Sequence, residues 1–194
     1  MSVTRWRWVR HAPTDPGGRV TGQTDIPALQ PDAESISRTA TMLRGTNAVL
    51  CSPLSRCRST LALLRAASPD LPEPVFRDDL IEQGFGAWEG RPYAEIGAWN
   101  GLDLSAMAAL RAPGGESFLD LVERVRDLIA RESVRHAGDT IAVIAHAGVI
   151  RAAVTLALDM PPHRGLSLVI DPLSVTAISD HGAGGWAVDH VNRV

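Results

Sequence analysis

The sequence predicts an α/β protein with three layers, α/β/α, in which helices cover both faces of a mostly parallel central sheet with an antiparallel edge. Two observations lead to this fold. Short apolar segments alternate with segments of helical periodicity over most of the chain. The last segments alternate strand and turn, which adds a hairpin at one edge. With 194 residues, of which 45% are hydrophobic, residues 1–194 are expected to form one domain.

The strand expected over residues 3–10 starts the sheet. Alternation of side chains along a strand places Trp6 and Trp8 on one face. A strand that is buried on both faces is usually apolar throughout. We therefore expect Arg5 and Arg7 to lie at the beginning of this strand, where the sheet is open to water.

Pro13 stops this strand and leaves Arg10 and His11 at its carboxyl end, which is the end where parallel α/β sheets bind ligands. The polar, irregular segment over residues 16–27 follows directly. Segments of this kind are frequently functional, so we expect this one to cover the site.

A helix is predicted to begin after Asp32 and to end at Gly45, and a short buried strand is predicted over residues 48–51. Ser55 is the expected N-cap of the helix that follows. This helix carries Arg56 in its first turn, where an arginine and the positive end of the helix together favour a bound anion.

In the second half, residues 92–111 are predicted to form short helices. The clearest helix of the chain starts at Phe118, shows one apolar stripe and ends at Gly138. A buried strand over residues 140–145 runs into His146, after which a new helix begins. The tail is expected to contain strands over residues 166–171, 174–179 and 186–191.

Composition excludes several classes of function. The net charge of −3 and the scattered arginines give no basic footprint for nucleic acid. The sequence has no signal-peptide pattern and no apolar stretch of membrane-spanning length, so a cytoplasmic protein with no membrane partner is expected. Cys51 and Cys57 fit no zinc motif and are expected to be small buried hydrophobic residues.

The predicted topology brings several charged side chains to one edge of the sheet. Arg10 and His11, then Arg56, then His146 each follow the carboxyl end of a strand. Glu82 is the acidic residue that stands in a loop of comparable rigidity. Two arginines, two histidines, a helix start and a carboxyl group are typical of a site for a phosphoryl group and its nucleophile.

These residues lie within segments that resemble, in the same order, those of the histidine phosphatase superfamily, also called phosphoglycerate-mutase-like. The segments are RHAPT (10–14), TGQTD (21–25), SPLSRC (52–57), EQGFGAWEG (82–90), GGES (114–117) and AHAGVIR (145–151). The short chain, the loop over residues 82–90 and the tail near Asn192 look most similar to the α-ribazole phosphatase branch, which acts in cobalamin assembly.

The resemblance implies a phosphoglycerate-mutase-like fold and assigns roles to residues. His11 would be the nucleophile that forms a phosphohistidine, and Glu82 would protonate the leaving alkoxide. Arg10, Arg56 and His146 would hold the phosphoryl oxygens, with no metal and no cofactor. Further substrate contacts are implied for Thr14, Thr21, Gly22, Gln23 and Ala147.

The expected function is that of a metal-independent phosphomonoesterase, a histidine acid-type phosphatase acting on a small phosphorylated metabolite such as α-ribazole 5′-phosphate. The protein would be a monomer or a homodimer. Two alternatives stay open: a phosphoglycerate mutase, and a catalytically idle regulatory protein that binds phosphorylated ligands. A mutase is disfavoured because the stretch from Glu82 to His146 is shorter than the mutases carry.

Other phosphatase chemistries fit the sequence less well. A cysteine-dependent phosphatase needs an arginine six positions after its cysteine. Six positions after Cys51 the sequence has Cys57, and Arg58 comes one position too late. A metal-dependent phosphatase needs clustered Asp and His ligands, and the spacings do not supply them. We expect Arg58 to be a solvated helix residue.

Some residues near the motifs have simpler interpretations or depart from the family. Glu89 competes with Glu82 as the acid, but a structural hydrogen bond is expected for it. The aromatic residues of this region, Trp88, Tyr93 and Trp99, are expected in the core rather than in a pocket. Ala12 and Ala147 stand where the family usually has glycine, which is tolerable where φ is negative.

Overall fold

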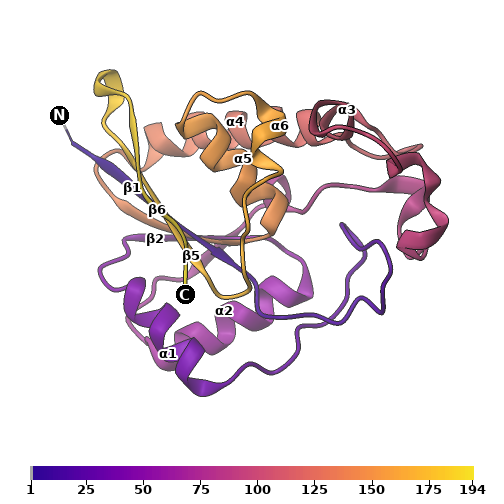
Figure 1. Ribbon diagram of the computed structural model, residues 1–194. Coiled ribbons are helices and arrows are strands. Elements are labelled where there is room, and N and C mark those ends of the chain that lie inside the picture. The colour runs from indigo at the N-terminus through magenta and orange to yellow at the C-terminus, as the bar shows by residue number, and fades with distance from the viewer. Residues whose placement is uncertain (1) are drawn as a thin grey trace.

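The computed structural model describes residues 2–194 and is built around one six-stranded sheet with the order β3-β2-β4-β1-β5-β6 (Figure 1). The four strands β1, β2, β3 and β4 run parallel, whereas β5 and β6 form an antiparallel edge. The strands are β1 (Thr4–Arg10), β2 (Ala48–Cys51), β3 (Pro74–Phe76), β4 (Thr140–Ala145), β5 (Val175–Asp180) and β6 (Trp186–Arg193). The predicted α/β class is confirmed.

Helices cover both faces of the sheet. In Figure 1, α1 (Ala33–Met42) and α2 (Ser55–Ala67) lie on one side, and α4 (Phe118–Arg135), α5 (Ala147–Ala157) and α6 (Pro162–Gly165) lie on the other. The short helix α3 (Leu104–Ala109) packs beside α4 and α6. Single turns of 3-10 helix are η1 (Asp78–Leu80), η2 (Gly86–Trp88), η3 (Tyr93–Glu95), η4 (Gly97–Trp99) and η5 (Gly182–Gly184).

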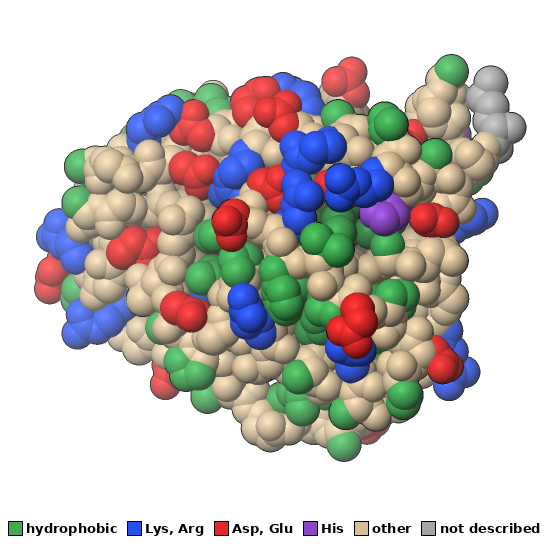
Figure 2. All heavy atoms as spheres, turned by 180° about the vertical axis from the view of Figure 1, so that it is seen from behind, with side chains coloured by type: hydrophobic (Ala, Val, Ile, Leu, Met, Phe, Trp, Pro, Cys, Tyr) green, Lys and Arg blue, Asp and Glu red, His purple; other side chains and the backbone are tan. Residues whose placement is uncertain are grey.

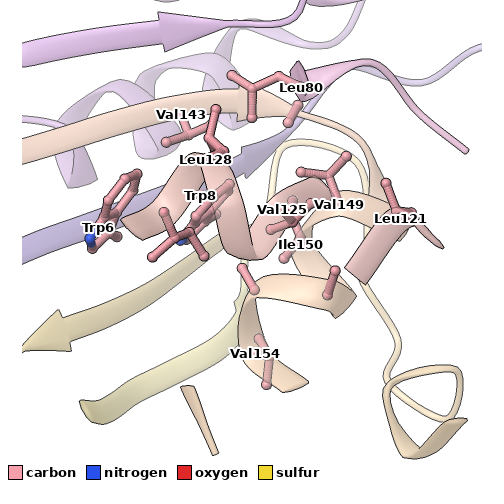
Figure 3. Close-up of a cluster of buried hydrophobic side chains, with 14 of the residues drawn as sticks. Trp6, Trp8, Leu80, Leu121, Val125, Leu128, Val143, Val149, Ile150 and Val154 are labelled. Atoms are coloured by element: carbon pink, nitrogen blue, oxygen red, sulfur yellow. The ribbon is translucent and has the colours of Figure 1, made fainter. Parts of the chain in front are cut away.

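The core is divided by the sheet, and β1 contributes to both halves. Trp6 and Trp8 stack with ring centroids 5.3 Å apart on the side of α4 and α5. Figure 3 shows them beside apolar residues of these helices, among them Leu128 and Val125. Val9 faces the other half, formed with α1 and α2. The strand β4 pairs with β1 and β2 in the middle of the sheet and is covered on both faces. All of its residues are therefore buried.

Local sequence signals account for several helix starts. The side chain of Asp32 accepts a hydrogen bond from the backbone N–H of Ser35, at 2.7 Å, and so caps α1. Ser117 and Asp120 form a reciprocal capping box at the start of α4. The predicted strands over residues 48–51 and 140–145 coincide with β2 and β4.

Two local predictions are wrong for the same reason, namely contacts with distant segments. Ser55 is not an N-cap. It is the first residue of α2, and the carboxylate of Asp25 accepts hydrogen bonds from its backbone N–H (2.8 Å) and its hydroxyl (2.7 Å). Arg7 is not left open to water, because its guanidinium donates to the carbonyl oxygens of Met42 (2.8 Å) and Arg44 (2.7 Å) at the end of α1. Arg5 is exposed, as expected.

The tail also differs from the prediction at one place. Residues 166–171 form a turn and an extended segment, not a strand. Both edges of β1 are already paired, with β4 and β5, so the sheet has no position for another strand there. Instead, the carbonyl oxygens of Leu168 and Ile170 accept hydrogen bonds from Arg151 and Arg10.

Acidic and basic side chains are interspersed on the surface. Figure 2 shows both signs mixed over the face seen from behind. One pair lies deeper: Glu132 of α4 is fully buried and pairs with Arg77 at 2.9 Å. No helix among residues 2–194 is long and apolar enough to cross a bilayer.

Candidate active site

Neighbouring strands deliver the predicted residues to one end of the sheet. Arg10 ends β1 and lies opposite Ala145, which ends β4, so His11 and His146 follow two paired strands. Cys51 of β2 lies opposite Ile144, which brings Arg56 of α2 to the same edge. The rings of His11 and His146 meet edge to face, with centroids 5.1 Å apart.

The imidazole of His11 is held in one tautomer. Its Nδ1 lies 2.7 Å from the carbonyl oxygen of Ala12, and because a carbonyl can only accept, Nδ1 carries the hydrogen. The lone pair is therefore on Nε2. Burial lowers the pKa of His11 to about 3, and the charges of Arg56 and Arg10 act in the same direction, against the hydrogen bond to Ala12. The result is a neutral imidazole with an unprotonated Nε2.

The backbone around His11 is fixed by Thr60 of α2. The Thr60 hydroxyl accepts a hydrogen bond from the backbone N–H of Ala12 (2.8 Å) and donates one to the carbonyl oxygen of Arg56 (2.7 Å). Thr60 is fully buried. This residue links the two segments that carry His11 and Arg56, a role that sequence reasoning did not assign to it.

His146 is fully buried, and both of its ring nitrogens have protein partners. The Nε atom of Arg56 donates to Nδ1 at 3.3 Å, so Nε2 carries the hydrogen and donates to the Ser52 hydroxyl at 2.8 Å. Burial, followed by the neighbouring His11 and Arg56, holds the pKa of His146 well below its usual value. His146 thus orients Arg56, and a direct bond from it to a phosphoryl oxygen stays a prediction.

Arg56 draws the loop over residues 16–27 across the site. Its two terminal nitrogens donate to the carbonyl oxygens of Thr24 (2.9 Å) and Gly22 (2.5 Å). The carboxylate of Glu89 accepts the backbone N–H groups of Gly22, Gln23 and Thr24 from the other side. Glu89 therefore has the structural hydrogen bonds that were expected. Burial raises its pKa, but these bonds and the Thr24 hydroxyl outweigh it, so the pKa is lower than usual.

Glu82 lies at the N-terminus of α5. One carboxylate oxygen accepts the backbone N–H of Gly148 and the other that of Gln83, both at 3.0 Å. A methyl group on Gly148 would lie 2.3 Å from the Glu82 carboxylate, so only glycine allows this approach. Arg124 of α4 holds the preceding segment by donating to the carbonyl oxygen of Ile81 at 2.8 Å.

These groups surround a cavity of about 260 Å³. Among the residues singled out from the sequence, those that line it are Arg10, His11, Thr14, Thr21, Arg56, Glu82 and Ala147. Gly22 and Gln23 belong to the covering loop and not to the lining. The Gly22 carbonyl binds Arg56, and the Gln23 side chain donates to the Glu82 carbonyl oxygen at 3.2 Å.

Sequence reasoning missed several lining residues, among them Tyr93 and Arg151. Tyr93 was expected in the core, but it is 51% exposed and lines the cavity. Its segment projects from the body as a string of single helical turns, too short to bury an aromatic ring on all sides. Arg151 lies four residues after Ala147 on α5, and this helical spacing from an expected substrate contact was the signal that could have identified it.

The departures from the family pattern are sterically mild, and the competing chemistries are disfavoured. Neither Ala12 nor Ala147 has a positive φ, so their methyl groups cause no backbone strain. Burial raises the pKa of the Cys51 thiol to about 12 and that of Cys57 well above its usual value, which makes both poor nucleophiles. Arg58 lies outside the lining, over the ring of Phe76 at 4.1 Å.

The residues from 2 to 194 include no group of three or more His, Cys, Asp or Glu side chains arranged to hold a metal ion. The site combines a neutral, oriented imidazole, the buried Arg56, the half-buried Arg10 and a carboxyl group at a helix N-terminus. Such a set can bind a phosphoryl group, attack it and protonate a leaving oxygen.

Known proteins resemble this chain in sequence and in fold. The sequence profile of the histidine phosphatase superfamily (branch 1) matches residues 8–194. The chain belongs to this superfamily. Among curated relatives, the bifunctional protein Rv2228c of Mycobacterium tuberculosis is 35% identical to this chain over 154 residues. The matched residues cover 77% of the chain and 41% of that relative. The chain thus spans about two fifths of that protein's length.

A metal-independent phosphoserine phosphatase of Arabidopsis thaliana is 30% identical over 161 residues, covering 77% of the chain and 67% of that protein. Among solved structures, a mycobacterial glucosyl-3-phosphoglycerate phosphatase superposes with a TM-score of 0.84 at 24% identity, over 99% of this chain and 100% of the phosphatase chain. This likeness concerns the fold alone. A putative α-ribazole-5′-P phosphatase of Escherichia coli superposes with a TM-score of 0.81, at 25% identity, over 97% and 96% of the two chains.

Proposed function

We propose that this protein is a metal-independent phosphomonoesterase that hydrolyses a small phosphate ester through a phosphohistidine on His11. The observation that supports the proposal most directly is the state of His11: its Nδ1–H is bound to Ala12, its Nε2 is free of hydrogen, and it lines a cavity together with the buried Arg56 and the half-buried Arg10. A neutral nucleophile avoids the repulsion that a phosphate dianion exerts on an anionic one.

In the first step, Nε2 of His11 attacks phosphorus while the bond between phosphorus and the ester oxygen breaks. Arg10 and Arg56 neutralise charge on the non-bridging oxygens, which is the main contribution a protein makes to phosphoryl transfer. Protonated Glu82 gives its proton to the departing oxygen, and the product alcohol leaves.

In the second step, the Glu82 carboxylate takes a proton from water, and the resulting hydroxide attacks the phosphohistidine. The bond between phosphorus and Nε2 breaks, inorganic phosphate is released, and His11 returns to its neutral form. Glu82 is protonated again, so the cycle closes with water as the only co-reactant.

The finer proposal for the substrate is α-ribazole 5′-phosphate, a step in cobalamin assembly in the cytoplasm. Two observations favour it: the sequence resembles that branch of the family, and the E. coli structure superposes over 97% of the chain. Both are likenesses to another protein, so the substrate is tested separately from the reaction.

The experiment measures phosphate release in EDTA from 4-nitrophenyl phosphate, α-ribazole 5′-phosphate, phosphoserine and 3-phosphoglycerate. Wild type is compared with His11→Ala and with His181→Ala, which removes an exposed histidine outside the site. Wild type and His181→Ala are expected to be active, and only they should form an acid-labile phosphoprotein on rapid quenching. Activity in His11→Ala, or loss of activity in EDTA, would contradict the mechanism. Conversion of 3-phosphoglycerate to its 2-isomer without phosphate release would identify a mutase.

A further inference from the structure

The side of β1 opposite Trp6 and Trp8 carries two arginines that the proposed reaction does not use. Alternation along the strand places Arg5 and Arg7 on the face of α1 and α2. A strand in the middle of a sheet is usually apolar on both faces, so packing does not explain these two residues. Both line a second cavity, of about 400 Å³. None of the described residues lines both this cavity and the cavity around His11.

The second cavity lies over the antiparallel edge of the sheet. Ala177 of β5 lies opposite Arg7 of β1 on one side and opposite His190 of β6 on the other. Neighbouring strands are about 4.8 Å apart, so the small side chain of Ala177 leaves a hollow between two residues roughly 10 Å apart at the backbone. Arg44, which follows α1, and Arg193, at the end of β6, complete the lining. Positive side chains from three parts of the fold therefore border one hollow.

The positive charges of this cavity are not balanced by the protein. Among residues 2–194, Asp189 is the acidic residue of the lining, and it accepts a hydrogen bond from the Ser179 hydroxyl at 2.9 Å. The ion pairs found among the same residues include none of the arginines of the lining. The chain as a whole has a net charge of −3, so a generally basic surface does not account for this cluster. These arginines are Arg5, Arg7, Arg44 and Arg193.

Two side chains of the lining are partly buried and lack an anionic partner. One terminal nitrogen of Arg7 donates to carbonyl oxygens at the end of α1, and its other nitrogens form no hydrogen bond with residues 2–194. Burial lowers the pKa of Arg7, and the charge of Arg5 lowers it further. Nε2 of His190 is buried and has no hydrogen-bond partner among the described residues. Burial, followed by the charge of Arg193, lowers the pKa of His190. An anion that accepts hydrogen bonds would stabilise both groups.

We propose that this cavity binds a small polyanion with two linked phosphate groups, either inorganic diphosphate or the diphosphate of a nucleotide. Guanidinium groups match phosphate oxygens with paired, charge-assisted hydrogen bonds. A single phosphate group would reach the arginines of one side, whereas two linked groups contact Arg5 and Arg7 of β1 together with Arg193 of β6. The inference does not depend on the proposed function, because the residues of this cavity take no part in that reaction.

The experiment titrates ¹⁵N-labelled protein with diphosphate, orthophosphate and ADP at constant ionic strength in EDTA, and follows the backbone amide signals by NMR. The signals of single residues separate this cavity from the one around His11, which is also expected to bind phosphate. Diphosphate should shift the signals of Arg7, Ala177 and His190, with a Kd at least about tenfold below that of orthophosphate. Tighter binding of ADP than of diphosphate would identify a nucleotide as the ligand, and weaker binding would identify the free ion. A parallel titration of His11→Ala excludes shifts caused by hydrolysis of the ligand.

Arg5→Gln and Arg193→Gln should each raise the Kd for diphosphate at this cavity by about tenfold, because each variant loses a charge-assisted contact. Both side chains are exposed, so the spectra should remain those of the folded protein. The matched control is Arg164→Gln, which removes an exposed arginine of α6 outside the lining and should keep the wild-type Kd. An absence of shifts at the cavity, or equal Kd values for diphosphate and orthophosphate, would overturn the inference. An equal loss of affinity in all three variants would also overturn it, because it would indicate non-specific attraction to positive charge.

Discussion

Single hydrogen bonds determine the state of the reacting groups at the scale of the residue. Ala12 takes part through its backbone on both sides: its carbonyl oxygen holds Nδ1 of His11, and its N–H is held by the Thr60 hydroxyl. A methyl group in place of the family's glycine leaves both bonds intact. The identity of the side chain at position 12 therefore matters less than the buried hydroxyl beneath it.

Replacement of Thr60 by valine should disturb catalysis without removing any group that touches substrate. The Ala12 N–H would be left buried without a partner, which costs about 1–3 kcal/mol in the free energy of unfolding. The loop that carries His11 would shift, and kcat should fall about tenfold or more. Enzyme kinetics and urea unfolding measure the two effects.

The control is Thr176→Val. The Thr176 hydroxyl is also fully buried and also accepts a hydrogen bond from a backbone N–H, that of Asn192 at 3.2 Å, but it lies on β5 outside the cavity lining. The Thr176→Val variant should show a similar decrease in the free energy of unfolding and keep the wild-type kcat. If the two variants lost kcat equally, Thr60 would have no specific link to His11.

Replacement of Gly148 by alanine should move the carboxyl group of Glu82. The added methyl would lie 2.3 Å from a Glu82 oxygen and 3.0 Å from Leu121, whereas alanine is otherwise favoured in a helix by about 1 kcal/mol. The fold should persist, and kcat should fall for esters with a poor leaving group more than for 4-nitrophenyl phosphate, which needs less protonation. Gly97→Ala, where the nearest atom is 4.0 Å away, should be silent. Equal losses on both kinds of ester would argue against Glu82 as the proton donor.

At the scale of the element, α4 supports the segment that carries Glu82. Arg124 donates to the carbonyl oxygens of Asp79 (3.0 Å) and Ile81 (2.8 Å), and it pairs with Glu116. Arg77 joins the same segment to buried Glu132. The segment after β3 has little regular structure of its own, so its shape depends on these side chains.

Arg124→Met should leave the partly buried carbonyl oxygens of Asp79 and Ile81 without this donor and loosen the segment before Glu82. We expect faster hydrogen exchange over residues 79–84 and a kcat lower by about tenfold, with a smaller change in KM. Arg126→Met is the matched control, because Arg126 is exposed on the same helix and pairs with Glu123 of that helix. Unchanged exchange in Arg124→Met would mean that the segment holds its shape without α4.

At the scale of the whole molecule, two buried neutral histidines make the stability dependent on pH. An unfolded histidine titrates near pH 6.5, whereas the pKa of folded His11 is about 3 and that of His146 is also low. Between these values the unfolded state binds more protons than the folded state. The free energy of unfolding therefore falls as the pH decreases below about 6.5, by up to ~1.4 kcal/mol per pH unit for each histidine, and neither contributes above that range.

His11→Gln should reduce this slope by about one proton between pH 6 and pH 4, as measured by urea unfolding at several pH values. His181→Ala, which removes an exposed side chain, should keep the wild-type slope. Equal slopes in wild type and His11→Gln would show that His11 takes up its proton in the folded state. The same low pKa predicts that protonation of free His11 does not cause a loss of kcat/KM between pH 4 and pH 6.

The sequence by itself determined the elements and the main residues of the site. Apolar runs and helical periodicity are local, so the strands over residues 48–51 and 140–145 and the stripe of α4 were found from them. Motif order then indicated that Arg10, His11, Arg56, Glu82 and His146 would meet, because neighbouring parallel strands end at one edge. The family and the α/β class follow from the same signals.

Only the tertiary structure decided which partner each polar group found. Asp25 binds Ser55 from 30 residues away, Arg7 binds the end of α1, and residues 166–171 accept hydrogen bonds from cavity arginines in place of strand pairing. The tautomer of His146 likewise depends on distant contacts, those with Arg56 and Ser52. A hydrogen bond or a buried charge is governed by groups that are close in space, and the local sequence does not specify which those are.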